Sequence, residues 1–548
     1  MLDLKGAYFY FLAKKINLIK IFKKFYFRTN FYKKTLISTT PENIYFYPNP
    51  FLLSSLINHK NFTFNVLDID VDMFWSNQNS KKEERDLHNF LWLNLINRKN
   101  NALVIQKIIT VWIYKNSKYK NIIWESSVLS RRIISWILNA DIILNKTDNV
   151  FKNDFFQSVI IQTNHLKKNI KFENDYSKKI EAICAILLSG LVFKEYEENF
   201  NIGIKELKKL IENFFDKDGF PLNRNPSDLI KFSKYFILIK ECIKDAQQFV
   251  PDFLDEIIEK NLSCIKSIIT PSNQIPLFNG STEVNIEKYL VYLDGLNYKL
   301  GKQVYEIGSL KILKNKKNYI FFDAGSPPKK GFSSHYQSGP LSFEYYFEGD
   351  KIITNCGFGS NISKKAILLS RLTSAQSTLT LNDCSVVKFE RNKTVNSAFG
   401  NSIKNSFNVF EVDFLENENE IKTSATHDAY RKDFGVTCKR TIRMNKKDNC
   451  IYGCEELIQK REINSLFFNI RFHLNPDVTA VQTIGGKSVL IQARKKKSLI
   501  FTAAEQNLTL EKSIFLGGNK IINNLCITIS GNLHSSEKKI YWELKKNI

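Results

Sequence analysis

A polar, glycine-flanked segment in the middle of the chain carries the residue best suited to proton transfer. His335 lies in the run SSHYQSG at residues 333–339, just before an alternating apolar stretch typical of a β-strand. A loop side chain beside a strand can project into a cleft, and histidine titrates near neutral pH. We therefore predict that His335 acts as a general acid or base, with Tyr336 as a second candidate. The alternative is a histidine that serves only packing and hydrogen bonding.

Two further polar segments could contribute to a site. Arg224 and Asn225 lie in the run DGFPLNRNPS at residues 218–227, and an arginine offers a bidentate clamp for a carboxylate. The alternative for this pair is a capped turn with an exposed arginine. His427 and Tyr430 lie in the run HDAY, where an adjacent carboxylate could fix the histidine tautomer, although consecutive strand residues face opposite ways.

The elements that must position these residues change type along the chain. From about residue 89 to residue 300, apolar residues recur at helical spacing, as in the stripe through residues 202–215 that ends before Gly219. From about residue 303 the period becomes two, as in LSFEYYF at residues 341–347. Many short strands without intervening helices predict an antiparallel sandwich. Serial helices predict a bundle or a toroid, and periodicity alone does not choose between them.

The length of 548 residues is too great for one core and predicts two folded domains. We expect a basic N-terminal segment at residues 1–75, an α-helical domain at residues 76–300 and a β-sandwich at residues 301–548. A composition of 43% apolar and 24% charged residues is ordinary for a globular protein, so it indicates neither disorder nor a membrane bundle. The sequence leaves the oligomeric state open.

The net charge of +24 predicts attraction to polyanions such as an acidic polysaccharide, anionic lipid or nucleic acid. A compositional cause is the alternative, because the chain is also rich in Asn, Ile and Phe, which A/T-rich coding favours along with Lys. We expect no nucleic-acid binding, since no reading motif accompanies the charge. Nor does the sequence contain a Gly-rich phosphate loop, a G-x-S-x-G elbow or an H-E-x-x-H motif.

The N-terminal residues alternate between basic and aromatic types. The apolar run at residues 7–13 is broken by Lys14 and Lys15 without a small-residue cleavage site, so we expect no secretory signal and, from the sequence alone, a cytoplasmic location. This segment could form an amphipathic helix that makes peripheral contact with an anionic membrane. The alternative is a basic leader that packs on the protein or stays mobile. The longest apolar helical run, at residues 182–193, is too short to span a bilayer.

The nine cysteines are scattered and odd in number, which argues against a disulfide framework. Cys450 and Cys454 are the closest pair, but neither a second pair nor a nearby histidine completes a zinc site, so we expect buried thiols.

Several motifs, in this order, resemble those of the heparinase II/III-like polysaccharide lyases, and together they cover roughly residues 85 to 480. The loop at residues 335–339 resembles the family's H-x-H-x-[DG], and it leads into an L-S-F-E. The other matches are DGFPLNRNPS at 218–227, FNG at 278–280, RLTSAQSTL at 371–379, HDAY at 427–430 and RFHLNP at 471–476.

The resemblance implies an incomplete α/α toroid followed by an antiparallel β-sandwich, with the substrate cleft between them. It also implies β-elimination on an acidic, uronate-containing polysaccharide, and a location in the cell envelope or periplasm. Such a reaction needs a base, an acid for the leaving oxygen and a group that neutralises the carboxylate. The catalytic candidates are His335, Tyr336, Arg224 and Asn225. A catalytically degenerate relative that binds glycan without cleaving it is the alternative.

The sequence departs from the family at the positions that hold a structural zinc in some members. Gln337, Asn355 and Gln376 stand where a histidine, an aspartate and a histidine are expected. Uncharged amides are poor zinc ligands, so we predict no metal and no cofactor. The three amides could instead bond to one another and brace the loop. We assign Arg371, His427 and Tyr430 to loop bracing or substrate binding. The family's tyrosine after the N-P-S run is missing, and Tyr235 is the nearest one.

Overall fold

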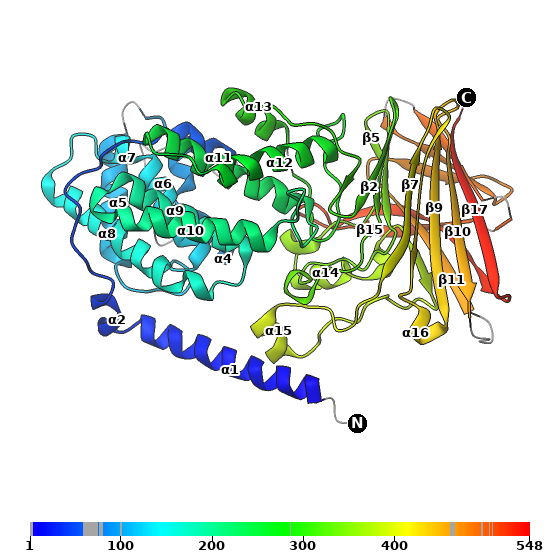
Figure 1. Ribbon diagram of the computed structural model, residues 1–548, viewed down its shortest axis with the longest axis horizontal. Coiled ribbons are helices and arrows are strands. Elements are labelled where there is room, and N and C mark those ends of the chain that lie inside the picture. Colours follow the sequence, from blue (N-terminus) through cyan, green and yellow to red (C-terminus); the bar gives the residue numbers. More distant parts are fainter. Residues whose placement is uncertain are drawn as a thin grey trace.

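Helices fill the first half of the chain and strands the second, as the change in hydrophobic period predicts (Figure 1). The structure is a computed structural model that describes residues 4–57, 75, 80–98, 101–284, 286–460, 466–494, 497–503, 505–506 and 508–547. We call residues 4–295 the helical part and residues 306–547 the β part. The predicted fold class, a helical toroid-like half followed by an antiparallel β-sandwich, is confirmed. The expected boundary after residue 75 borders residues outside this description.

The helical part is an incomplete α/α toroid of amphipathic helices. Its elements are α1 (Leu4–Phe27), α2 (Asn30–Lys34), the 3-10 helix η1 (Pro50–Leu56), α4 (Lys81–His88), η3 (Leu91–Leu95), α5 (Ala102–Asn116), α6 (Ser126–Leu138), α7 (Ala140–Ile143), α8 (Asn149–Asn169), η4 (Ile170–Phe172), α9 (Tyr176–Val192), η5 (Lys194–Tyr196), α10 (Glu197–Phe214), α11 (Pro226–Asp245), α12 (Asp252–Ile268) and α13 (Glu287–Gly295).

Local sequence fixes where the helices nearest the β part begin. Asp175 caps α9 by accepting from the Ser177 amide, and Asn225 caps α11 by accepting from the Ser227 amide, with Pro226 at the first helical position. These caps satisfy amides that a helix start leaves without partners. The N-terminal ends of α9 and α11 are therefore fixed where residues of the β part approach.

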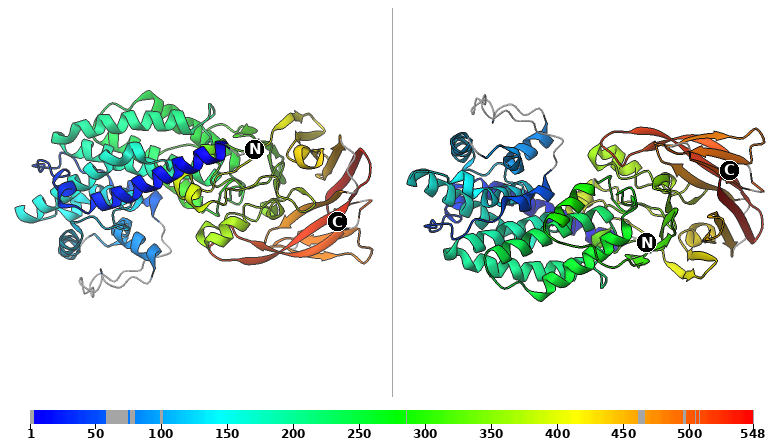
Figure 2. Two further views of the ribbon diagram at one scale, coloured as in Figure 1. Left: turned by 90° about the horizontal axis from the view of Figure 1, so that it is seen from below. Right: turned by 90° about the horizontal axis from the view of Figure 1, so that it is seen from above.

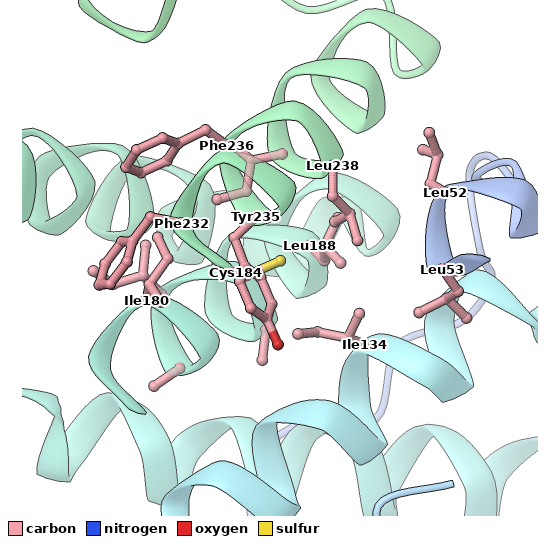
Figure 3. Close-up of a cluster of buried hydrophobic side chains, with 14 of the residues drawn as sticks. Leu52, Leu53, Ile134, Ile180, Cys184, Leu188, Phe232, Tyr235, Phe236 and Leu238 are labelled. Carbon is pink, nitrogen blue, oxygen red and sulfur yellow. The ribbon is translucent and has the colours of Figure 1, made fainter. Parts of the chain in front are cut away.

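The helical core is built from the inward faces of α6, α9 and α11. Figure 3 shows Tyr235 of α11 pointing toward Cys184 and Leu188 of α9 and Ile134 of α6. Tyr235 is buried, and burial raises the pKa of its hydroxyl well above the ordinary value. The tyrosine that follows the N-P-S run in this chain is therefore a core residue.

The β part consists of strands β1 (Glu306–Ile307), β2 (Leu310–Lys314), β3 (Asn318–Asp323), β4 (Phe343–Phe347), β5 (Asp350–Thr354), β6 (Leu379–Leu381), β7 (Val409–Glu416), β8 (Glu420–His427), β9 (Val436–Asn445), β10 (Ile451–Gln459), β11 (Leu466–Leu474), β12 (Thr479–Gln482), β13 (Ser488–Gln492), β14 (Ser498–Thr502), β15 (Leu508–Phe515), β16 (Ile522–Leu533) and β17 (Glu537–Lys546). Short helices interrupt it: η6 (Lys330–Phe332), η7 (Gly359–Asn361), α14 (Lys364–Leu369), η8 (Thr373–Ala375), α15 (Lys393–Phe399) and α16 (Arg431–Phe434).

These strands form two antiparallel sheets that pack face to face. One sheet has the order β1-β2-β3-β4-β5-β11-β16-β15, with β6 also on β11, and the other has the order β12-β13-β14-β17-β10-β9-β8-β7. Between them, Phe343 of β4 stacks on Trp542 of β17 with ring centroids 5.6 Å apart. Aromatic pairs and alternating apolar residues therefore close the sandwich core.

Two details of the β part differ from the sequence prediction. Strand β4 begins at Phe343 because Leu341, predicted to lie within it, has a positive φ of 55° and turns the chain. His473 alternates with Phe472 and Leu474, which predicts a position on the face opposite the core, and the segment that carries Ser374 buries it on that face. The short strands that alternation predicted are otherwise present.

Helix α1 runs along the outside and joins the two parts. Its C-terminal end lies near α2 on the helical part, and its N-terminal end reaches α15 of the β part (Figures 1 and 2). Ala13 is fully buried against Val395 and Ala398 of α15. Within the part of the chain that the structure describes, no helix is both long and apolar enough to cross a bilayer.

Candidate functional site

His335 lies where a loop of the β part meets a loop of the helical part. It follows η6 and precedes β4, and its ring packs on Phe358 with centroids 5.1 Å apart. Gly280, from the helical side, has a φ of 98°, and a Cβ placed on it would lie 2.6 Å from the His335 Cβ. Glycine is thus required for this close approach. The imidazole remains exposed, so His335 sits at the junction of the two parts with an accessible ring.

Arg371 holds the loop on both sides of His335. Its Nε donates to the Tyr336 carbonyl over 2.9 Å, and its Nη2 donates to the Ser333 carbonyl over 3.0 Å. The Arg371 carbonyl also accepts from the Ser338 amide. The guanidinium is fully buried, and burial lowers its pKa to about 10, so it remains charged at neutral pH. Arg371 therefore binds the backbone on both sides of His335, and its role in bracing the loop stays a prediction.

Gln337 and Gln376 bind the same backbone carbonyl. Gln337 Nε2 donates to Ser370 O over 2.9 Å, and Gln376 Nε2 donates to the same oxygen over 2.8 Å. Gln337 Oε1 also accepts from the Gly280 amide over 3.1 Å, so this side chain links the loop to the helical part. The expectation that the three amide side chains bond to one another is wrong, because Gln337 and Gln376 donate to backbone carbonyls instead. Their bracing of the loop stays a prediction that mutagenesis must test.

The third amide and its neighbour do not suit a metal. Asn355 Oδ1 accepts from the Ser377 amide over 3.0 Å, while its Nδ2 is buried without a hydrogen-bond partner in the described structure. The adjacent Cys356 thiol donates to Gly357 O over 3.1 Å, and burial raises its pKa to about 12. Among the described residues, no group of three or more His, Cys, Asp or Glu could hold an ion. Amides and a protonated thiol therefore do not fit a zinc site.

Asp228 is a component that the sequence interpretation missed. It lies in the first turn of α11, and its Oδ2 accepts from Asn223 Nδ2 over 2.6 Å. Burial raises the pKa of Asp228, whereas the Asn223 bond, Lys231 and His335 oppose this rise. Protein around His335 lowers the pKa of its imidazole, while the negative charges of Asp228 and Asp175 raise it. The two side chains, one from each part, therefore interact electrostatically at the junction.

A sequence signal for Asp228 did exist. It directly follows the N-P-S run, close to where the resembled family carries its tyrosine, and it is a titratable residue at the start of a helix. However, Asp228 can be recognised as a site residue only once the His335 loop is known to lie beside it. Because the sequence does not show that approach, we had no reason to select Asp228.

Arg224 lies inside the junction rather than on a substrate-facing surface. Its Nη1 pairs with Asp323 Oδ1 over 2.8 Å, and both side chains are more than nine-tenths buried. Its Cζ lies 5.8 Å from the centroid of the Tyr336 ring. The predicted role as a carboxylate clamp for substrate does not fit this position, nor does the alternative of an exposed arginine. Arg224 instead joins the helical part to β3.

Asn225 lies beside the loop that carries His335. Its Oδ1 caps α11, and its Nδ2 lies 3.2 Å from where a Cβ on Gly280 would be, close to His335. The structure therefore brings Asn225, Asp228 and His335 into one region.

Three other predicted site residues are buried. Tyr336 is 1% exposed, and burial raises the pKa of its hydroxyl above the ordinary value. His427 and Tyr430 lie in the sandwich core, where burial lowers the pKa of His427 to about 3 and the Tyr430 hydroxyl donates to Cys384 O over 2.8 Å. We therefore withdraw the prediction that these side chains contact substrate. Polar residues in a motif suggested a site, whereas His427 and Tyr430 bond to backbone groups of the β part.

Comparison with known proteins supports this reading of the fold. Residues 302–543 match the model of the heparinase II/III-like C-terminal family. The chain is 22% identical over 441 residues to the FtsZ-localized protein C of Caulobacter vibrioides, covering 78% of this chain and 75% of that protein.

Solved structures extend the likeness over the helical part. The heparan sulfate lyase HepC from Pedobacter heparinus superposes with a TM-score of 0.62 at 16% identity, over 89% of this chain and 80% of that one. A heparinase III superposes with a TM-score of 0.62 at 14% identity, over 100% of this chain and 92% of that one. At such identities these likenesses show the fold, and the family model adds the ancestry of the β part. The β part thus resembles the heparinase II/III-like C-terminal family, and the chain as a whole shares the fold of the heparinase III structures.

Proposed function

We propose that this protein is a polysaccharide lyase that cleaves an acidic, uronate-containing glycan by β-elimination at the junction of its two parts. The observation that carries the proposal is an accessible His335 whose loop is fixed by a buried Arg371 and which interacts with Asp228 from the opposite part. Similar structures include a heparan sulfate lyase, which supports the same reaction class. The net charge of +24 supports an anionic substrate.

In the proposed reaction His335 is the base. Its lowered pKa keeps the imidazole neutral at pH 7, so a ring nitrogen can remove the proton next to the uronate carboxylate. The electron pair of that C–H bond forms the new C=C bond, the glycosidic C–O bond breaks, and the leaving oxygen needs a proton. The imidazolium formed on His335 returns the proton to the leaving oxygen, and the nearby Asp228 carboxylate stabilises this imidazolium. The Asn225 amide, beside Gly280, neutralises the substrate carboxylate by hydrogen bonding.

A second candidate is a relative that binds glycan without cleaving it. The observation that favours it concerns the two candidate tyrosines: Tyr235 lies in the helical core (Figure 3), and Tyr336 is buried. The name of the Caulobacter relative refers to a location with FtsZ rather than to a reaction. Under this alternative the junction holds a glycan and the His335 ring contributes a hydrogen bond only.

One assay separates the two candidates. Purified protein is incubated with a panel of uronate polysaccharides while the ultraviolet absorbance of the unsaturated product is followed. We expect product from at least one glycan, none from His335→Ala, and full activity from His534→Ala, an exposed histidine near the turn between β16 and β17. Binding without product across the panel favours the second candidate. Equal activity of wild type and His335→Ala would refute the role of His335.

The substrate class also suggests where the protein works. We propose a location at the cell envelope, since acidic polysaccharides are found there, together with a peripheral contact with an anionic membrane. Fractionation of cells into soluble and envelope fractions tests the location. Recovery of all the protein in the soluble fraction at low salt would contradict it.

A further inference from the structure

Helix α1 presents a continuous apolar and aromatic stripe to solvent. The stripe consists of Tyr8, Phe11, Leu18, Phe22 and Phe25, which recur every three, four or seven residues and therefore share one face. Phe11, Phe22 and Phe25 are 68%, 70% and 64% exposed. We call these five residues the outer stripe. Exposed apolar groups in a contiguous row indicate a surface that something else covers.

The opposite face of α1 is already occupied. Ala13 packs on α15, Asn17 Nδ2 donates to Thr394 O over 2.9 Å, and Lys20 Nζ donates to Ser397 O over 2.8 Å. The helix is thus held by its inner face along the outside of the molecule, as Figure 2 shows from below. Among the described residues, the outer stripe is therefore the face of α1 that no other element covers.

The charged residues of α1 itself are all of one sign. Helix α1 contains six lysines and no Asp or Glu, and Lys14 and Lys15 are exposed near the stripe. Beyond its C-terminal end, a small pocket is lined by Arg28, Lys33 and Lys118, with no carboxylate among its lining residues. A row of aromatic and aliphatic groups flanked by cations matches an anionic bilayer, where rings enter the interface and ammonium groups meet phosphates.

We propose that the outer stripe docks α1 onto an anionic lipid surface, with its axis in the membrane plane. This specifies the surface for the peripheral contact proposed above, and it does not depend on lyase activity. The same docking holds the junction of the two parts at a fixed distance from the bilayer, because α1 is bound to α15 of the β part and reaches the helical part at α2. A glycan attached to the envelope would then be met by a tethered enzyme.

Vesicle co-sedimentation tests the proposal on the full chain. Vesicles of phosphatidylcholine alone are compared with vesicles that also contain phosphatidylglycerol, and binding is measured at low and high salt. We expect binding to the anionic vesicles only, weakened by salt because screening reduces the attraction of lysines to lipid. Replacing Phe11, Phe22 and Phe25 by Ser should weaken binding roughly tenfold per residue, as expected for lost apolar burial.

Control variants separate membrane docking from other effects. Phe249→Ser removes an equally exposed phenylalanine between α11 and α12 and should bind like wild type. The double variant Lys14→Glu, Lys15→Glu keeps the apolar stripe and should weaken binding to anionic vesicles at least tenfold. This variant provides the test if circular dichroism shows that the triple Ser variant is misfolded. His335→Ala should bind vesicles normally, so loss of catalysis and loss of docking are distinguishable.

Three outcomes would overturn the proposal. The first is equal binding to neutral and anionic vesicles, and the second is unchanged binding of both the Ser and the Glu variants. The third is a dimer of the wild-type protein in analytical ultracentrifugation without vesicles, together with a monomer for the triple Ser variant. That result would mean that a second copy of this chain covers the stripe.

Discussion

The ion pair between Arg224 and Asp323 joins the helical part to the first sheet, and we predict that breaking it destabilises the protein far more than breaking a surface pair. The two groups lie 2.8 Å apart with side chains 8% and 4% exposed. Arg224 Nε and Nη2 already lack hydrogen-bond partners in the described structure, and Asp323 is the carboxylate that pairs with the guanidinium there. Asp323→Asn leaves this charge buried and unpaired, at a cost of about 3–5 kcal/mol.

A matched exposed pair provides the control. Arg471 pairs with Asp383 over 3.0 Å, but Asp383 is 61% exposed, so Asp383→Asn should cost less than about 1 kcal/mol. Urea unfolding is followed by tryptophan fluorescence and circular dichroism, and both variants are compared with wild type. Replacing both Arg224 and Asp323 with Met and Leu should recover most of the loss, because no buried charge is then left unpaired. An Asp323→Asn midpoint equal to that of the control would refute the reasoning.

Three further predictions concern pH and metal. Because the pKa of His335 is lowered from its ordinary value of 6.5, turnover should decline only when the pH falls below 6.5. The negative charge of Asp228 raises the His335 pKa, so Asp228→Asn should move this decline to lower pH, and a move to higher pH would contradict the prediction. Burial alone would raise the pKa of Glu181, but Arg131 and Lys231 outweigh it and lower this pKa to about 2. The ionised Glu181 then contributes about 3 kcal/mol above pH 4.5 that is lost as pH falls toward 2, and unfolding of Glu181→Gln between these values should lack that dependence. Elemental analysis should find no stoichiometric zinc, and a chelator should leave the unfolding midpoint unchanged; bound zinc would refute the metal-free prediction.

The fold could be predicted because it follows from periodicities that every segment repeats. Helical spacing through α10 reports its buried face, alternation through β4 identifies a strand that is buried on both faces, and the order of motifs resembles one family. The site could be predicted only in part. His335 stood out because its loop is polar, but whether Arg224 faces solvent depends on Asp323, which lies 99 residues away in sequence. Long-range partners of this kind leave no mark on local sequence.

The residues around the His335 loop also explain how the loop can be ordered without a metal. A zinc ion would bring two positive charges and would need anionic or imidazole ligands, whereas Gln337, Asn355 and Gln376 bring none. Arg371 places a buried positive charge beside the same loop, and among the described residues no carboxylate pairs with this guanidinium. That charge would repel a dication. It also donates to the two carbonyls that flank His335, which is the orienting task that metal ligation performs elsewhere. The absence of metal-ligand side chains at these three positions and the presence of the Arg371 guanidinium therefore belong together. Hydrogen bonds from Arg371 to the backbone orient the loop in place of metal coordination.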